Sequence, residues 1–318
     1  MFSLNALIIF ERITYQMKDF NLPENADTYV NTVKDRCVDL ISHKIWSGIK
    51  VLDLLRWFKN FEGEKEKYFA ACVLDTLIYR SSEQVDAMAY EIFTKKLPQV
   101  LRSFGYRFES YKCFLDKLRG GSILDIRLVS VANKRERPTK SSNIILRGFR
   151  RNLGLNDNYF ISPEEILDEI RAGVKTFIFI DDFLGTGDQF HSMWTENGLA
   201  LVMKDVNVVY SPLVAHEKGI SSLEERCSEV KICYAEYLAS FSNVFESAFN
   251  DNVNTPESAQ YFYDELLNKY KFDDSLGDNN KYGHGCLGLA YTFYHSSPDN
   301  CLHIIWDNKD GWHPLIPK

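Results

Sequence analysis

The chain has 318 residues, of which 45% are hydrophobic and 25% are charged, and its formal net charge is −7. These values are ordinary for globular proteins, so the composition excludes wholesale disorder and a fibrous repeat. At about 150 residues per domain, the length favours roughly two domains. The acidic balance argues against a general nucleic-acid coat protein and leaves room for a local basic site.

The apolar runs and the cysteines of the chain indicate the cellular compartment in which we expect it. No run reaches the roughly 18 consecutive apolar residues of a membrane span, so we expect no membrane contact. The apolar residues 1–10 lack a preceding basic residue, which favours a packed leader strand or helix over a signal peptide. The cysteines number seven and form no C-x-x-C pair, which fits reduced, buried thiols in a cytoplasmic protein. No H-x-x-x-H pair occurs, which argues against a structural zinc site.

The first third of the chain has the spacing of helices. From about residue 24 to residue 102, apolar residues recur three or four positions apart in successive segments. This pattern predicts a helical N-terminal region over residues 1–115. Its helices are expected to bury their apolar faces against one another or against a partner.

The sequence pattern of residues 116–318 predicts strands that alternate with helices. Strands are predicted at 123–131, 174–180, 206–214, 231–238, 289–294 and 303–306. Helices are predicted at about 143–152, 187–203, 219–227 and 256–271, and Ser162, Pro163 and Glu165 mark the start of another that ends near Gly173. The alternation predicts an α/β fold with a mostly parallel sheet.

The segment 176–189 carries most of the chemistry. An apolar strand ends in the adjacent acids Asp181 and Asp182, at the edge where open α/β sheets bind ligands. The bend Gly185–Gly187 then leads into a predicted helix, whose first amide groups attract anions. Carboxylates hold sugar hydroxyls or Mg²⁺, while amides and a threonine hydroxyl hold phosphate. A sugar 5-phosphate carries both kinds of group at about this separation.

The acid pair has other possible interpretations. Walker-B-like elements also end in acids, but the chain contains no G-x-x-x-x-G-K-[ST] motif. A phosphohydrolase would use a D-x-D motif, whereas Asp181 and Asp182 are adjacent. A plain strand, turn and helix without a ligand is the remaining alternative.

This segment resembles the phosphoribosyl diphosphate (PRPP) motif of type I phosphoribosyltransferases, in which two acids after a hydrophobic strand precede a Thr- and Gly-rich loop. The resemblance implies that Asp181 and Asp182 contact the ribose 2- and 3-hydroxyls, act in catalysis, and hold Mg²⁺ if the chain is an enzyme. It assigns the 5-phosphate to a loop made of Gly185, Thr186, Gly187 and Asp188. Asp188 and Gln189 depart from the Gly and Thr that are usual there.

A longer likeness covers most of residues 30–318. The segments Trp57–Phe61, Ile180–Phe190, Pro298–Trp306 and Trp312–Leu315 are similar to a divergent phosphoribosyltransferase-like group of bacterial anti-phage conflict systems, some members of which lie next to reverse transcriptases. The resemblance implies a type I phosphoribosyltransferase-like domain over 116–318, in an effector that binds PRPP or a nucleotide and acts at ribose C1. The alternative is a non-catalytic sensing module that binds a partner protein, an RNA, or a reverse-transcriptase complex.

Two further segments have roles that the resemblance implies. The basic segment 134–140 follows the first predicted strand, so Arg137, Lys140 and Ser141 would face the diphosphate. A solvated loop or an RNA-contacting patch is an equal alternative. Tyr282, in a glycine-rich turn, would cover a base, or the turn is a flexible connector.

The residues after the strand predicted at 206–214 offer a possible acid or base. His216 or Glu217 would assist proton transfer, although capping or salt-bridging is the plainer interpretation.

Overall fold

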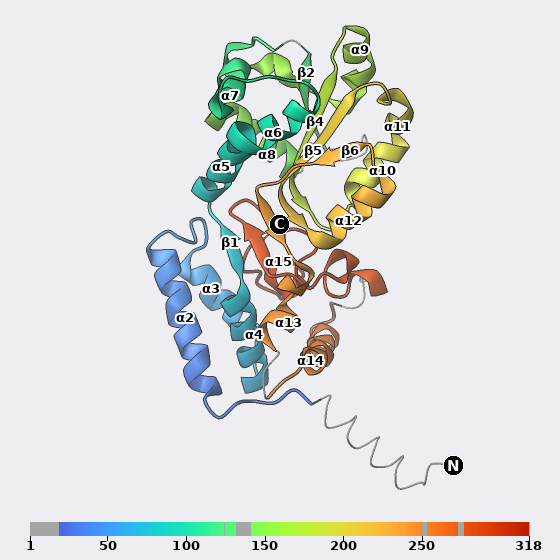
Figure 1. The fold of residues 1–318 in the computed structure, drawn as a ribbon. Helices are drawn as coiled ribbons and strands as arrows, with labels where there is room; N and C mark the ends of the chain where they lie inside the picture. Colours follow the sequence, from blue (N-terminus) through green and yellow to red (C-terminus); the bar gives the residue numbers. More distant parts are fainter. Residues whose placement is uncertain (1–18, 124, 132–140, 250–252, 273–276, 318) are drawn as a thin grey trace, which may run out of the picture. The chain divides into compact units, whose positions relative to one another are not determined.

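The computed structural model describes residues 19–123, 125–131, 141–249, 253–272 and 277–317 (Figure 1). The chain divides into two compact units. Unit 1 joins residues 1–81 to residues 241–318, and unit 2 consists of residues 82–240. Because the two ends of the chain build one unit together, the units divide the chain at places other than the boundary expected at residues 115 and 116.

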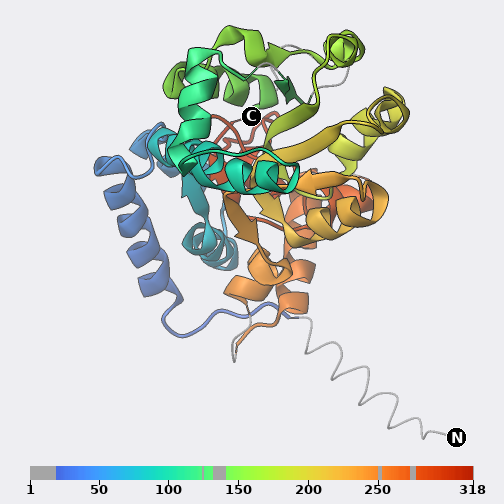
Figure 2. The same ribbon diagram turned by 45° about the horizontal axis from the view of Figure 1, so that its top comes forward.

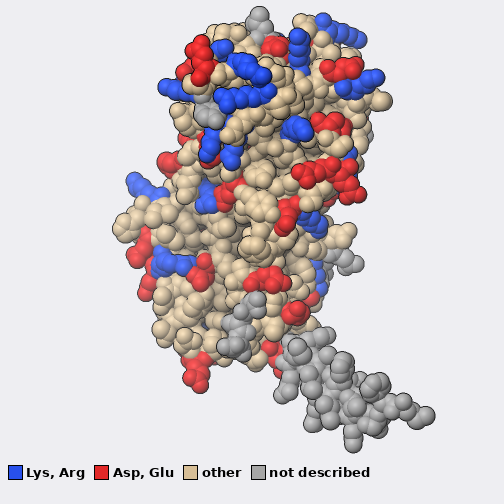
Figure 3. All heavy atoms as spheres, viewed as in Figure 1, with Lys and Arg blue, Asp and Glu red and all other residues tan. Residues whose placement is uncertain are grey.

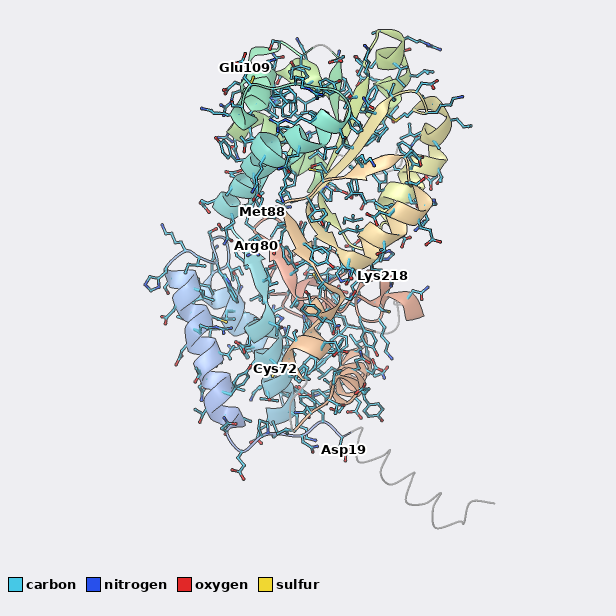
Figure 4. The ribbon with its side chains drawn as sticks, viewed as in Figure 1. Asp19, Cys72, Arg80, Met88, Glu109 and Lys218 are labelled. Carbon is cyan, nitrogen blue, oxygen red and sulfur yellow. The ribbon has the colours of Figure 1, made fainter. Side chains whose placement is uncertain are left out.

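Unit 1 combines the front helices with the C-terminal segment. Its helices are α2 (Ala26–Ser42), α3 (Val51–Phe58), α4 (Glu64–Thr76), α13 (Val244–Ala248), α14 (Pro256–Lys269) and α15 (His303–Trp306). Strand β1 (Ile78–Arg80) pairs in parallel with β8 (Tyr291–Phe293). Phe69 of α4 stacks on Phe249 at 5.2 Å between ring centroids, and Cys72, labelled in Figure 4, is 2% exposed. The apolar faces of the front helices are thus covered by the C-terminal part of the same chain.

The strand predicted at residues 303–306 is wrong, because these residues form the short helix α15. The carbonyl of Ile304 accepts hydrogen bonds from the indole Nε1 of Trp57 at 2.6 Å and of Trp312 at 3.2 Å. The β-branched residues Ile304 and Ile305 are buried as a strand would bury them. Their burial comes from tertiary packing, which overrides the β propensity of such a short segment.

Unit 2 is built on a parallel sheet. Its described strands are β2 (Ile126–Ser130), β3 (Phe160–Ile161), β4 (Thr176–Leu184), β5 (Asn207–His216), β6 (Val230–Ile232) and β7 (Glu236–Leu238). Among the described residues, five strands of this sheet run in the order β3-β2-β4-β5-β6, and the sixth, β7, pairs with β5. Every pairing in this sheet is parallel. The α/β class with a mostly parallel sheet and N-terminal helices is therefore confirmed.

Helices lie on both sides of this sheet (Figures 1 and 2). They are α5 (Ser82–Glu91), a π-helical turn (Ile92–Lys96), α6 (Leu97–Ser103), α7 (Tyr111–Gly120), α8 (Ser141–Leu153), α9 (Ile166–Arg171), α10 (Asp188–Glu196), α11 (Leu199–Val202) and α12 (Glu217–Arg226). The single helix predicted at 187–203 is two helices, because Gly198 has a φ of 62° and ends the first of them.

Two surface properties of the described residues bear on function. No helix in the described ranges is both long and apolar enough to cross a membrane. Figure 3 shows Lys and Arg side chains gathered over the part of unit 2 that carries α6 and α7. Exposed members of this basic surface are Arg102, Lys112, Lys117 and Arg119. Positive charge is therefore concentrated locally in a chain that is acidic overall.

Candidate functional site

Strand β4 delivers the two predicted acids to the C-terminal edge of the sheet. It lies between β2 and β5, and its residues from Thr176 to Asp182 are all buried. This central position explains the continuous apolar run before Asp181, since both faces of the strand are covered. Asp181 is 2% exposed and Asp182 is 8% exposed.

Asp181 is enclosed by hydrogen-bond donors. The hydroxyl of Tyr210, on β5, donates to its Oδ2 at 2.8 Å, and the amide of Asp182 donates to its Oδ1 at 3.0 Å. The ring of Tyr210 stacks on Phe190 of α10 at 4.3 Å between centroids. Burial, and next the charge of Asp182, raise the pKa of Asp181 well above its usual range. Asp181 is thus the more enclosed acid of the pair, and Asp182 is the more exposed one.

The bend Gly185–Gly187 follows directly and opens α10. Gly187 has a φ of 85°, which only glycine adopts without strain. The Thr186 hydroxyl donates to Oδ2 of Asp188 at 2.7 Å, and Nη1 of Arg226 lies 2.9 Å from Oδ1 of the same carboxylate. The additional acid beside the predicted phosphate loop is thus paired with a cation. Its carboxylate occupies the position at the start of α10 that favours an anion.

Helix α12 supports the bend through backbone contact. A Cβ atom on Gly219 would lie 2.5 Å from the carbonyl oxygen of Gly185 and 2.8 Å from the side chain of Leu184. A Cβ atom on Gly187 would lie 3.0 Å from Cγ of Leu223. Figure 4 labels Lys218, which precedes Gly219 in the first turn of this helix. The glycines let two segments approach more closely than any other residue would allow.

His216 ends β5 beside this bend, because Leu184 and Ala215 are partners in the sheet. It is 3% exposed, and its Nδ1 accepts the amide of Lys218 at 3.1 Å. Burial lowers the pKa of His216, so the ring favours its neutral form with the proton on Nε2. Nε2 is buried and has no hydrogen-bond partner among the described residues. This ring therefore offers a free donor at the edge of the sheet.

Glu217, the other residue considered for proton transfer, is already engaged. Its Oε2 accepts the hydroxyl of Ser240 at 2.6 Å and the amide of Ser240 at 2.9 Å. These hydrogen bonds lower the pKa of Glu217. A carboxylate stabilised in this way is a weaker base than a free one.

The remaining predicted site residues come from other parts of the chain. Arg137 and Lys140 are outside the described residues, and Ser141 is the first residue of α8. Tyr282 belongs to unit 1, where its ring packs at 5.2 Å from that of Phe245. The diphosphate and base-covering roles of these residues stay predictions. The structure does bring together Asp181, Asp182, Gly185, Thr186, Gly187 and Asp188.

The fit of Mg²⁺ can be judged from the donor set. In the described part of the chain, no group of three or more His, Cys, Asp or Glu side chains converges to hold a metal ion. Both oxygens of Asp181 already accept hydrogen bonds. Protein-bound Mg²⁺ commonly uses one or two carboxylates together with substrate phosphates and water. Asp182, the more exposed acid, is the candidate for that role, and Asp181 would have to give up one of its hydrogen bonds to share it.

Three of the four segments of the longer likeness belong to unit 1, and the fourth, Ile180–Phe190, belongs to unit 2. The side chain of Asn60 donates to the carbonyl of His313 at 2.8 Å and accepts the amide of His313 at 3.1 Å. The ring of Phe61 packs edge-on against that of Trp312 at 5.4 Å. A model of the PRTase-CE family matches residues 54–318. This chain belongs to the PRTase-CE family.

PRTase-CE domains are phosphoribosyltransferase-like and associated with conflict systems. The match begins within α3 and includes residues of both units, so the PRTase-CE domain takes in most of the front helices as well as the parallel sheet. A comparison with curated proteins finds no match to the chain.

Proposed function

We propose that this PRTase-CE protein binds PRPP or a nucleotide through its ribose 5-phosphate group, as part of a bacterial anti-phage defence system. The Asp182 carboxylate accepts hydrogen bonds from the sugar hydroxyls. The amides of the bend and the Thr186 hydroxyl donate hydrogen bonds to the phosphate. One observation carries the proposal: the central strand carries the Asp182 carboxylate near its C-terminal end, and the bend that opens α10 begins three residues after Asp182.

Phosphate binding in this proposal requires an exchange of partners in the bend. The Thr186 hydroxyl, which now donates to Asp188, turns to a phosphate oxygen. Arg226 keeps the displaced Asp188 carboxylate neutralised, since the two side chains already form an ion pair. The Nε2 donor of His216 lies at the same edge and is available to a further phosphate oxygen. Each exchange replaces one hydrogen bond by another, so few donors or acceptors of the bend lose a partner.

In the catalytic form of this proposal, the chain acts at ribose C1. The bond from C1 to the diphosphate oxygen breaks, the diphosphate leaves with the electron pair, and a nucleophile bonds to C1. Bound Mg²⁺ would supply charge stabilisation to the leaving diphosphate. Arg137, Lys140 and Ser141 are the proposed diphosphate contacts, and Tyr282 is the proposed cover of the base.

Sensing without turnover is the second candidate, and Asp181 favours it. This carboxyl is buried, and its raised pKa favours the uncharged form, so the ligand contact is assigned to Asp182, the more exposed acid of the pair. In this form, ligand binding changes the affinity for a partner protein or RNA, such as a reverse-transcriptase complex. The basic surface over α6 and α7 suits an RNA partner electrostatically.

Calorimetric titration of the full chain with PRPP and with ribose 5-phosphate, in the presence of Mg²⁺, tests the proposal. Asp182→Asn and Thr186→Val are each expected to weaken binding about tenfold, which corresponds to ~1.4 kcal/mol. Asp205→Asn, an exposed acid of the same unit, is the matched control and should leave the affinity unchanged. Absence of saturable binding to the wild-type chain, or equal affinities in all variants, would refute the proposal.

Release of diphosphate, followed by phosphorus NMR in the same samples, separates the two forms. The catalytic form predicts PRPP consumption that Asp182→Asn abolishes. The sensing form predicts binding with intact PRPP.

A further inference from the structure

Unit 1 contains a pocket that the proposed function does not use. The pocket has a volume of about 460 Å³ and lies among the start of α3, strand β1, the two residues after β8 and residues 313–317. Its apolar base includes Ile49, Tyr79 and Leu315, all less than 10% exposed. This volume lies within the roughly 300–1,000 Å³ that small-molecule sites occupy.

Positive charge predominates around this pocket. Lys50 and Arg56 both line it and are exposed, and no described acid forms an ion pair with either side chain. The lining contains one acid, Asp53, whose Oδ2 accepts the amide of Lys50 at 3.0 Å. That carboxylate serves as the cap of α3. The two cations are therefore available to an anion, and Arg56 suits a phosphate or a carboxylate by its planar fork of donors.

Flat rings form another part of the lining. Tyr294 is 38% exposed at the pocket. The ring of His295 lies beside it and stacks on Phe293 at 5.2 Å, with an angle of 19° between the ring planes. Aromatic and imidazole faces of this kind bind the faces of planar ligands such as nucleobases.

The walls of the pocket are fixed by hydrogen bonds from outside it. The His313 backbone is held by Asn60, as described above, and the amides of Leu315 and Ile316 donate to the carbonyl of Ile305 at 2.9 and 3.2 Å. The hydroxyl of Tyr79 donates to the carbonyl of Ser47. A site whose walls are already ordered loses less entropy when it binds a ligand.

We propose that this pocket is a second ligand site, which takes a nucleoside monophosphate. The phosphate binds Lys50 and Arg56, and the base packs against Tyr294 and His295. All of these residues belong to unit 1, so the inference does not depend on the sugar-phosphate site of unit 2. A chain with both sites would respond to two ligands.

Calorimetric titration with adenosine 5′-monophosphate tests the second site, using the full chain carrying Thr186→Val to weaken the site in unit 2. Saturable binding should persist in this background, and Arg56→Gln or Lys50→Gln should weaken it about tenfold. Lys59→Gln changes an exposed lysine at the end of the same helix that does not line the pocket, and should have no effect. Thermal unfolding of each variant checks that it folds like its parent.

Three outcomes would overturn the inference. The first is the absence of saturable binding in the Thr186→Val background. The second is an equal affinity of the Arg56→Gln and Lys59→Gln variants. The third is that inorganic phosphate competes as effectively as the nucleotide, because the adenine base would then contribute nothing to the affinity. If the wild type binds adenosine 5′-monophosphate and the Thr186→Val variant does not, the nucleotide binds in unit 2. That result would overturn the second site and leave the proposed function intact.

Discussion

Replacing Asp181 by Asn tests the state of the buried carboxyl at the end of β4. The Asn Oδ1 can still accept the amide of Asp182, and its amide group can donate to the Tyr210 oxygen. The variant should therefore fold, within about 1 kcal/mol of the wild type at low pH. The difference between the two proteins should appear in how their stability depends on pH.

The pKa of Asp181 is raised by folding, so the folded state holds its proton more tightly than the unfolded chain. The stability linked to this group is complete below the unfolded pKa of about 3.9 and is lost as the pH rises through the folded pKa. Within that interval, one proton corresponds to a slope of about 1.4 kcal/mol per pH unit. The Asn side chain in Asp181→Asn cannot titrate, so the variant does not lose this stability as the pH rises. Its free energy of unfolding should therefore rise relative to that of the wild type by about 1.4 kcal/mol for each pH unit.

Urea unfolding at a series of pH values from 4 upward measures this difference. Asp205→Asn serves as the control, because an exposed acid should give a profile parallel to that of the wild type. If Asp181→Asn also runs parallel to the wild type, Asp181 has an ordinary pKa in the folded state. The separation of roles between Asp181 and Asp182 would then fail.

Two further substitutions probe the bend. Gly219→Ala should cost about 1–3 kcal/mol and weaken ribose 5-phosphate binding, because its Cβ would lie 2.5 Å from the Gly185 carbonyl oxygen. Gly148→Ala, in a helix with no atom within 4 Å of its added Cβ, should instead stabilise the chain by about 0.5–1 kcal/mol in thermal or urea unfolding. A harmless Gly219→Ala would contradict the close packing of α12. Arg226→Gln should weaken phosphate binding about threefold at low salt, because it leaves the Asp188 charge unneutralised, and calorimetry showing no change would contradict that pairing.

Much of the sheet could be predicted from the sequence because its central strands are buried on both faces. The continuous apolar run predicted at 174–180 is β4, and the run at 206–214 is β5. Such runs are local signals and need no knowledge of the neighbours. The joining of residues 1–81 to residues 241–318 had no comparable signal, since it depends on contacts such as that of Trp57 with Ile304, 247 positions apart.

The order of groups along the site could also be predicted, but their environment could not. The spacing from Asp182 to the bend is visible in the sequence. Which acid is enclosed depends on Tyr210, and the pairing of Asp188 depends on Arg226, both from other elements. The free Nε2 of His216 follows from a local amide contact and from burial by neighbouring segments. Only the three-dimensional structure supplies these partners.

A crystal structure of the full chain grown with ribose 5-phosphate tests the central claim most directly. The account predicts phosphate density against the amides of Gly185–Gly187, with the Thr186 hydroxyl turned from Asp188 to the phosphate and with Asp182 on the ribose hydroxyls. Density for the ligand elsewhere, at full occupancy and with the Thr186–Asp188 hydrogen bond intact, would contradict it.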